Sequence, residues 1–137
     1  PVELVRGIQF SPPVSPDGKL IAYAKTEGQG SQARSKIEIQ KLDDGTILTE
    51  VGLPPTYTWH RLAWTPDGKA LTFVHNTTGS TQDVYMQPLS GGEPVQLTHF
   101  EKSIVVPDYA WSGDGKKFAV TRGHYNDTDV VMFSGFK

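Results

Sequence analysis

The sequence contains no cysteine, which excludes disulfide bonds and thiol chemistry from this chain. It also has little charge of one sign, since 13 Lys and Arg against 15 Asp and Glu give a formal net charge of −2. No cluster of basic residues occurs, so we expect no nucleic-acid partner. No apolar run approaches the roughly 20 residues of a membrane-spanning helix, so we expect no direct membrane insertion.

Glycine and proline are plentiful, and many of them fall in a motif that occurs three times. It reads Ser-Pro-Asp-Gly-Lys at 15–19, Thr-Pro-Asp-Gly-Lys at 65–69 and Ser-Gly-Asp-Gly-Lys at 112–116. The aspartates are spaced by 50 and 47 residues, and a fixed period of this length indicates a repeat architecture. Proline presets φ, aspartate bonds the nearby backbone and glycine allows positive φ, so each copy predicts a tight turn. The structural turn residues are Asp17, Gly18, Asp67, Gly68, Asp114 and Gly115.

Short β-branched and aromatic runs flank these turns and predict strands. They lie at 62–64 and 109–111 before the turns, and at 20–23, 71–74, 118–121, 36–40, 83–86, 129–132, 47–51 and 94–98 after them. Four antiparallel strands in each period are typical of a propeller blade. We therefore predict an all-β fold, a β-propeller segment of three four-stranded antiparallel blades. The connections 25–36 and 75–82 are predicted loops, rich in polar residues and glycine.

The chain resembles the TolB-like, WD-repeat-like family of six-bladed propellers. The resemblance rests on the three turns, on Trp64 and Trp111 before two of them, on Asp83 and Asp129, and on residues 91–98. It implies that the three blades form half of a six-bladed ring. The predicted segments are an orphan outer strand at 1–5, blade one at 6–53, blade two at 54–100, and blade three at 101–137, which lacks its own outer strand.

A narrower resemblance is to the C-terminal half-propellers of bacterial membrane-bound serine/threonine kinases and winged-helix regulators. It rests on residues 111–116, 121–123 and 128–131. It implies an extracytoplasmic sensor or interaction module. The sequence itself carries no kinase motif, so a kinase activity would belong to other parts of a parent chain.

Residues 1–5, Pro-Val-Glu-Leu-Val, resemble 94–98, Pro-Val-Gln-Leu-Thr, the outer strand of blade two. Two interpretations stay open. In one, two chains form a homodimer that closes a six-bladed ring, and each N-terminal strand completes the last blade of its partner. In the other, residues 1–5 are the remnant of a preceding blade.

Candidate ligand-binding residues lie where first strands would line a central channel. They are Tyr57, Trp59, His60, Arg61, Asp108 and Tyr109. The four histidines lack metal-ligand spacing, and Asp127 with Asp129 is followed by no calcium loop, so we predict no metal site and no cofactor. The sequence also lacks a Gly-x-Ser-x-Gly elbow.

Two function classes follow from these residues. The first is a non-catalytic propeller that binds a protein or small-molecule ligand, as part of a larger signalling protein. The second is an enzyme, or the accessory propeller of an enzyme, with a site in the channel at His60, Arg61 and Asp108. A tight cluster of these three side chains around a ligand would favour the second class.

Overall fold

The computed structural model describes residues 11–29, 33–53, 59–77, 79–124 and 127–136. Within these residues all regular structure is β-strand, and no helix there could cross a membrane. The chain divides into two compact units, Pro1–Tyr57 and Thr58–Lys137, which are described in turn.

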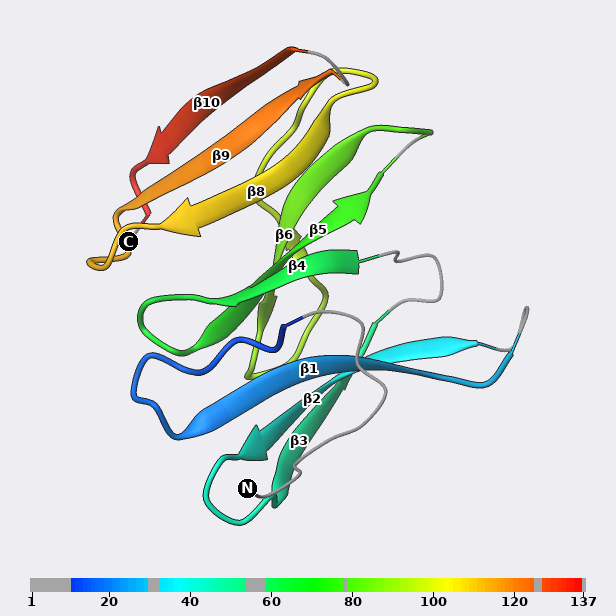
Figure 1. Ribbon diagram of the computed structural model, residues 1–137, viewed down its shortest axis with the longest axis vertical. Coiled ribbons are helices and arrows are strands. Elements are labelled where there is room, and N and C mark those ends of the chain that lie inside the picture. The colour runs from blue at the N-terminus through cyan, green and yellow to red at the C-terminus, as the bar shows by residue number, and fades with distance from the viewer. Residues whose placement is uncertain (1–10, 30–32, 54–58, 78, 125–126, 137) are drawn as a thin grey trace. The chain divides into compact units, whose positions relative to one another are not determined.

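The first unit contains one antiparallel sheet with the strand order β1-β2-β3 (Figure 1). Its strands are β1 (Leu20–Glu27), β2 (Arg34–Lys41) and β3 (Ile47–Gly52). Side chains alternate between two faces, as the twofold period of a strand requires. One face carries the buried Ile37 and Ile39 of β2.

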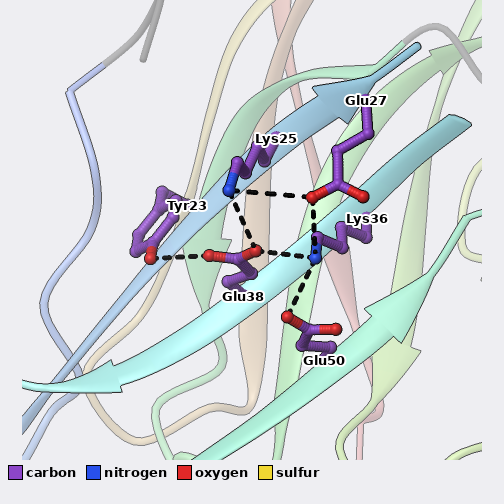
Figure 2. A network of polar contacts seen from close by, with 6 residues as sticks. All are labelled: Tyr23, Lys25, Glu27, Lys36, Glu38 and Glu50. Carbon is purple, nitrogen blue, oxygen red and sulfur yellow. Dashed lines mark hydrogen bonds and ion pairs between the residues drawn. The ribbon is translucent and has the colours of Figure 1, made fainter. Parts of the chain in front are cut away.

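The other face of this sheet carries a network of charged side chains (Figure 2). Lys36 Nζ lies 2.9 Å from Glu38 Oε1, 2.9 Å from Glu50 Oε1 and 3.0 Å from Glu27 Oε1. The Tyr23 hydroxyl donates a hydrogen bond of 2.7 Å to Glu38 Oε2. The Glu38 side chain is only 3% exposed, so its charge is held by these partners rather than by water.

The second unit contains two antiparallel sheets. In sheet two the order is β4-β5-β6-β7, and in sheet three it is β10-β9-β8, drawn in yellow to red in Figure 1. Their bounds are β4 (Trp59–Trp64), β5 (Ala70–Asn76), β6 (Gln82–Pro88), β7 (Val95–Gln96), β8 (Val105–Trp111), β9 (Lys117–His124) and β10 (Asp127–Ser134).

These two sheets share one apolar core. Val74 and Val84 of sheet two pack with Val106, Phe118 and Val120 of sheet three, and all five are fully buried. Partly buried aromatic side chains surround this cluster, among them the rings of residues 109, 111, 133 and 136. Burial of apolar area at about 25 cal/mol per Å² makes this core a stabilising contact between the two sheets.

The three predicted turns form with the same hydrogen bonds. In each, Asp Oδ1 accepts from the Ser or Thr hydroxyl two residues earlier, at 2.6–2.7 Å. It also accepts the backbone N–H two residues later, at 3.0–3.1 Å. The glycines Gly18, Gly68 and Gly115 have φ between 69° and 73°, which L-residues rarely adopt. Gly113 in the third copy therefore replaces proline without changing the turn.

The sheets of the described residues have three, four and three strands, which differs from the prediction of four strands in each; blade three was expected to lack an outer strand of its own. In the first repeat, the described residues before the turn, 11–14, form an isolated bridge from Val14 to Ile21. Pro12 and Pro13 precede Val14 and have no N–H, so these two positions donate no hydrogen bond to β1. Predicted strand 94–98 shortens to β7, because Pro94 also lacks a donor and the Thr98 hydroxyl replaces a strand contact at Val84 N.

The predicted loops are also shorter than expected. Strand β1 continues to Glu27 and β2 begins at Arg34, while β5 continues to Asn76 and β6 begins at Gln82. The predicted orphan strand at 1–5 lies outside the described residues, so its pairing stays a prediction.

Candidate functional site

The candidate site is the inner edge of the second unit, defined as His60, Arg61, Asp108 and Tyr109. It lies on β4 and β8, the first strand of each sheet, and within the described residues each of these strands pairs with one neighbour only. Both strands are bulged, β4 between His60 and Ala63 and β8 between Val105 and Asp108. A bulge redirects side chains out of the regular alternation.

Arg61 occupies the β4 bulge with a φ of 58°. A non-glycine residue in this left-handed region is uncommon, and it stays there only when its surroundings fix it. The Tyr109 hydroxyl supplies such a contact, because it donates a hydrogen bond to the Arg61 carbonyl. A side chain of sheet three thus fixes the backbone of sheet two at this point.

Tyr109 is therefore a structural contact between the sheets as well as a site residue. Its ring packs against Phe118 at 5.2 Å between centroids, and burial raises the pKa of its hydroxyl. Two further hydrogen bonds join the sheets: the Trp111 indole N–H donates to Thr72 Oγ1 at 3.3 Å, and Val106 N donates to Gln82 Oε1 at 2.8 Å. The inner edge is thus held on a rigid support.

The charged groups of the site are an exposed ion pair. Arg61 Nη1 lies 3.9 Å from Asp108 Oδ1, and the two side chains are 53% and 65% exposed. A pair of this kind contributes about 0–1 kcal/mol to stability. Either partner can therefore exchange its contact for a charged group on a ligand at little cost to the fold.

His60 lies beside this pair and is half-buried. Burial and then the positive charge of Arg61 lower the pKa of the imidazole, while a hydrogen bond with the Gln82 side chain opposes the shift. Because the ordinary value is already near 6.5, His60 is neutral at pH 7. It offers a ligand a neutral hydrogen-bonding ring rather than a charge.

The structure places four of the six sequence-predicted binding residues together. Tyr57 lies outside the described residues, as does the side chain of Trp59, whose backbone begins β4. The turn residues of the second and third repeats follow the other ends of β4 and β8, and those of the first repeat precede β1. No three or more His, Cys, Asp or Glu side chains of the described residues converge as metal ligands.

Sequence reasoning missed a polar crevice of about 530 Å³ at the end of sheet three where β8 begins. Arg122 lies over the Phe100 ring, 5.2 Å from its centroid, and its Nε lies 3.3 Å from Asp129 Oδ1. His99 and His124 line the same crevice. Asp129, which was considered above as a calcium ligand, thus pairs with an arginine. No local motif signals this crevice, because its residues are brought together from β9, β10 and the connection 99–104.

No protein-family model matches the chain. A curated relative is the protein named "Uncharacterized peptidase YuxL" of Bacillus subtilis (strain 168), which is 30% identical over 115 residues. The match takes in 80% of this chain but only 16% of the relative, so the chain spans a small part of the relative's length.

Solved propellers have the same fold. TolB from Acinetobacter baumannii matches 95% of this chain with a TM-score of 0.70 and 23% identity, over 31% of its own length. A putative TolB from Agrobacterium tumefaciens matches 96% with a TM-score of 0.73 and 17% identity, over 47% of its length. The propeller domain of the Trilobed protease from Pyrococcus furiosus matches 91% with a TM-score of 0.64 and 18% identity, over 38% of its length. The described fold is thus part of a β-propeller, similar to the propellers of TolB and to the propeller domain of a protease.

Proposed function

We propose that this chain is a non-catalytic binding module: a propeller segment that holds a protein or peptide ligand at the inner edge, within a longer protein. The observation that carries the proposal is the exposed Arg61–Asp108 pair, whose two members come from neighbouring sheets. Binding sites commonly place a few polar groups on a rigid scaffold. Here the scaffold is the Tyr109 contact and the shared core.

The proposal assigns no chemical step to these residues. Among the described residues, the His60 imidazole has a hydrogen bond with the Gln82 side chain, and an amide does not turn an imidazole into the base of a nucleophile. The Arg61–Asp108 pair offers one donor and one acceptor group, which suits the backbone and side chains of an extended peptide.

The test is an NMR titration of the ¹⁵N-labelled chain with three pools of unstructured decapeptides, one acidic, one basic and one uncharged. We expect shifts at the amides of residues 60–62 and 108–110. The charge of the peptide pool that binds most tightly shows which member of the ion pair contacts the ligand. The double variant Arg61→Ala/Asp108→Ala should weaken binding about fivefold or more, because it removes two charge-assisted contacts.

The matched control is Arg122→Ala/Asp129→Ala, which removes a second exposed Arg–Asp pair of the same unit. The control should bind the pools like the wild type. If the control loses binding and the inner-edge variant does not, the ligand site is the crevice of sheet three and the assignment to the inner edge is wrong.

A second candidate function is an accessory propeller of a peptidase. It is favoured by the 30% identity with a protein named as a peptidase and by the fold shared with the propeller of the Trilobed protease. In that case the inner edge would contact a substrate peptide, and catalysis would reside elsewhere in the longer protein. A fluorophosphonate probe of serine hydrolases should label that longer protein and leave the 137-residue chain unlabelled.

Three further hypotheses rest on the family resemblance or on residues 1–5. They are the narrower relation to kinase and regulator propellers, the extracytoplasmic location, and the ring formed by two chains. Light scattering tests the last, because a monodisperse monomer at high concentration contradicts it. The exposed Val130 and Met132 on one face of β10 give sheet three an apolar surface that suits a further blade.

A further inference from the structure

A groove of about 610 Å³ lies at the turn end of the second unit, between the hairpin of β4 and β5 and that of β8 and β9. Its apolar lining includes Pro66, Met86, Pro88, Trp111 and Phe136. We call it the turn-end groove. It is separate from the inner edge, because Arg61 lies near the start of β4 whereas the groove lies beyond its end. Its size falls within the range of ligand pockets, which are mostly apolar with a few polar groups.

The walls of the groove are fixed by contacts within the unit. Trp111 and Phe136 meet edge to face, with 4.9 Å between their centroids. Gly135, with φ of 96°, turns the chain after β10 so that Phe136 lies back on the sheet. On the other side, a Cβ built on Gly115 would lie 3.7 Å from Pro66 Cβ, which places the third turn in van der Waals range of the second. A groove with such walls keeps its shape when empty.

The polar groups at the mouth of the groove are the charged residues of two turns. Asp67 and Asp114 are engaged, since each Oδ1 accepts two hydrogen bonds inside its own turn. Lys69 and Lys116 are exposed, and neither ammonium group forms an ion pair or a hydrogen bond with another described residue. The ammonium groups of Lys69 and Lys116 are thus left to meet a ligand above an apolar floor, beside two carboxylates whose Oδ1 atoms are engaged in the turns.

We propose that the turn-end groove is a second binding site, which takes a peptide segment of a partner protein with an apolar side chain next to an acidic one. The apolar side chain fills the space between Trp111, Phe136 and Met86. The carboxylate contacts Lys69 and Lys116. This site uses no residue of the inner edge, so the two proposals stand or fall separately.

Three compounds that share one apolar body test the chemistry: 4-phenylbutyrate, 4-phenyl-1-butanol and 4-phenylbutylamine. Each is titrated into the full ¹⁵N-labelled chain, and the Trp111 indole N–H and the amides of residues 66–69 and 113–116 are followed. We expect shifts at these positions with 4-phenylbutyrate binding most tightly, by about two- to fivefold for each lysine that contacts it. The peptide acetyl-Gly-Leu-Phe-Glu-Gly-amide should shift the same signals more strongly than its Glu→Gln counterpart.

The variant Lys69→Gln/Lys116→Gln should abolish the preference for the carboxylate and keep the weaker binding of the alcohol. Both side chains are exposed, so the fold should not change. Lys19→Gln is the matched control, since Lys19 has the same place in the first turn but does not line the groove. Phe136→Ala should weaken all three compounds, because it removes a wall.

Several results would overturn the proposal. Equal affinity for the acid, the alcohol and the amine excludes a role for the lysines, and tighter binding of the amine assigns the site to cations. Shifts confined to residues 60–62 and 108–110 would move the ligand to the inner edge. Shifts of the groove signals on simple dilution, without ligand, would mean that a second copy of the chain covers the groove.

Discussion

The buried carboxylate of Glu38 gives the sharpest test of how the first sheet is held. The change is Glu38→Gln, which keeps the shape of the side chain and its contact with the Tyr23 hydroxyl but removes the charge. Two effects compete. A buried carboxylate costs several kcal/mol to desolvate, whereas hydrogen bonds to a charged group contribute about 1.5–3 kcal/mol against about 0.5–1.5 for neutral ones.

The geometry decides between these effects. Lys36 Nζ is 2.9 Å from Glu38 Oε1, Lys25 Nζ is 3.8 Å away, and the Tyr23 hydroxyl is 2.7 Å from the other oxygen. Burial alone would raise the pKa of Glu38, but the hydrogen bonds from Lys36 and Tyr23 outweigh it, and the pKa lies below the ordinary 4.5. The charged form is thus favoured in the fold. We expect Glu38→Gln to lower the free energy of unfolding by about 1–2 kcal/mol at pH 7.

The same reasoning fixes the pH dependence. A carboxyl group whose pKa is lowered by folding stabilises the fold above its unfolded pKa, and this contribution is lost as pH falls through the folded pKa. The difference between wild type and Glu38→Gln should therefore be full above about pH 5, and it should shrink as pH falls below 4.5 and through the lowered pKa of the folded state.

The assay is urea unfolding followed by far-UV circular dichroism, together with amide exchange of Ile37 and Ile39, which reports β2 directly. Glu50→Gln is the matched control, because its side chain contacts the same Lys36 Nζ but is 48% exposed, and it should change stability less. If Glu38→Gln proves neutral or stabilising at pH 7, the desolvation cost of the carboxylate equals or exceeds the gain from its charged hydrogen bonds, and the reasoning is refuted. A difference that does not change with pH would refute it as well.

Three further predictions concern other contacts. Burial, and then the hydrogen bond to the Glu38 carboxylate, raise the pKa of Tyr23 to about 12. The stability that Tyr23 contributes should therefore be complete below pH 10 and be lost as pH rises through 12. Phenolate absorbance follows this titration, and Tyr23→Phe should remove it. Gly123→Ala should destabilise the fold by about 1–3 kcal/mol in thermal melts, because a Cβ there would lie 2.1 Å from a backbone oxygen of the facing strand. Gly113→Ala is the control, because a Cβ at Gly113 would have no atom within 4 Å. Thr72→Val should lower the free energy of unfolding in urea by about 0.5–1.5 kcal/mol. It should also shift the fluorescence emission of Trp111, because the indole N–H loses its acceptor. An unchanged emission spectrum would contradict that contact.

The turns and most strands could be predicted because their signals are local. A Pro-Asp-Gly or Gly-Asp-Gly triplet predicts each turn, and short apolar runs predict the strands beside it. The number of strands in sheet one differed from the prediction among the described residues, where Pro12 and Pro13 lack N–H donors and Val14 forms an isolated bridge. Ser15 is part of the motif, but the sequence does not indicate its role. In the structure its hydroxyl donates a hydrogen bond to Asp17 Oδ1 within the first turn.

The candidate site could be predicted only in part. Arg61 and Asp108 belong to first strands, so their proximity follows from the repeat. Their bulges and the bond from Tyr109 to the Arg61 carbonyl do not, because they depend on the packing of one sheet on another. Tyr109, a candidate ligand-binding residue from the sequence, is half-buried and joins the two sheets.

The repeats also show where the sequence is free to change. The register pairs Glu38 with Glu50 in sheet one and Tyr85 with Gln96 at the corresponding place in sheet two. Charged groups around Lys36 hold the first pair, while the Tyr85 hydroxyl donates to Gln96 Oε1 at 3.0 Å in the second. Because the backbone ladder sets the distance between these strands, either chemistry fits between them. The turns cannot vary in this way, since their aspartate and positive-φ glycine are required by the backbone itself, and the repeat therefore stays recognisable at its turns while the paired positions diverge.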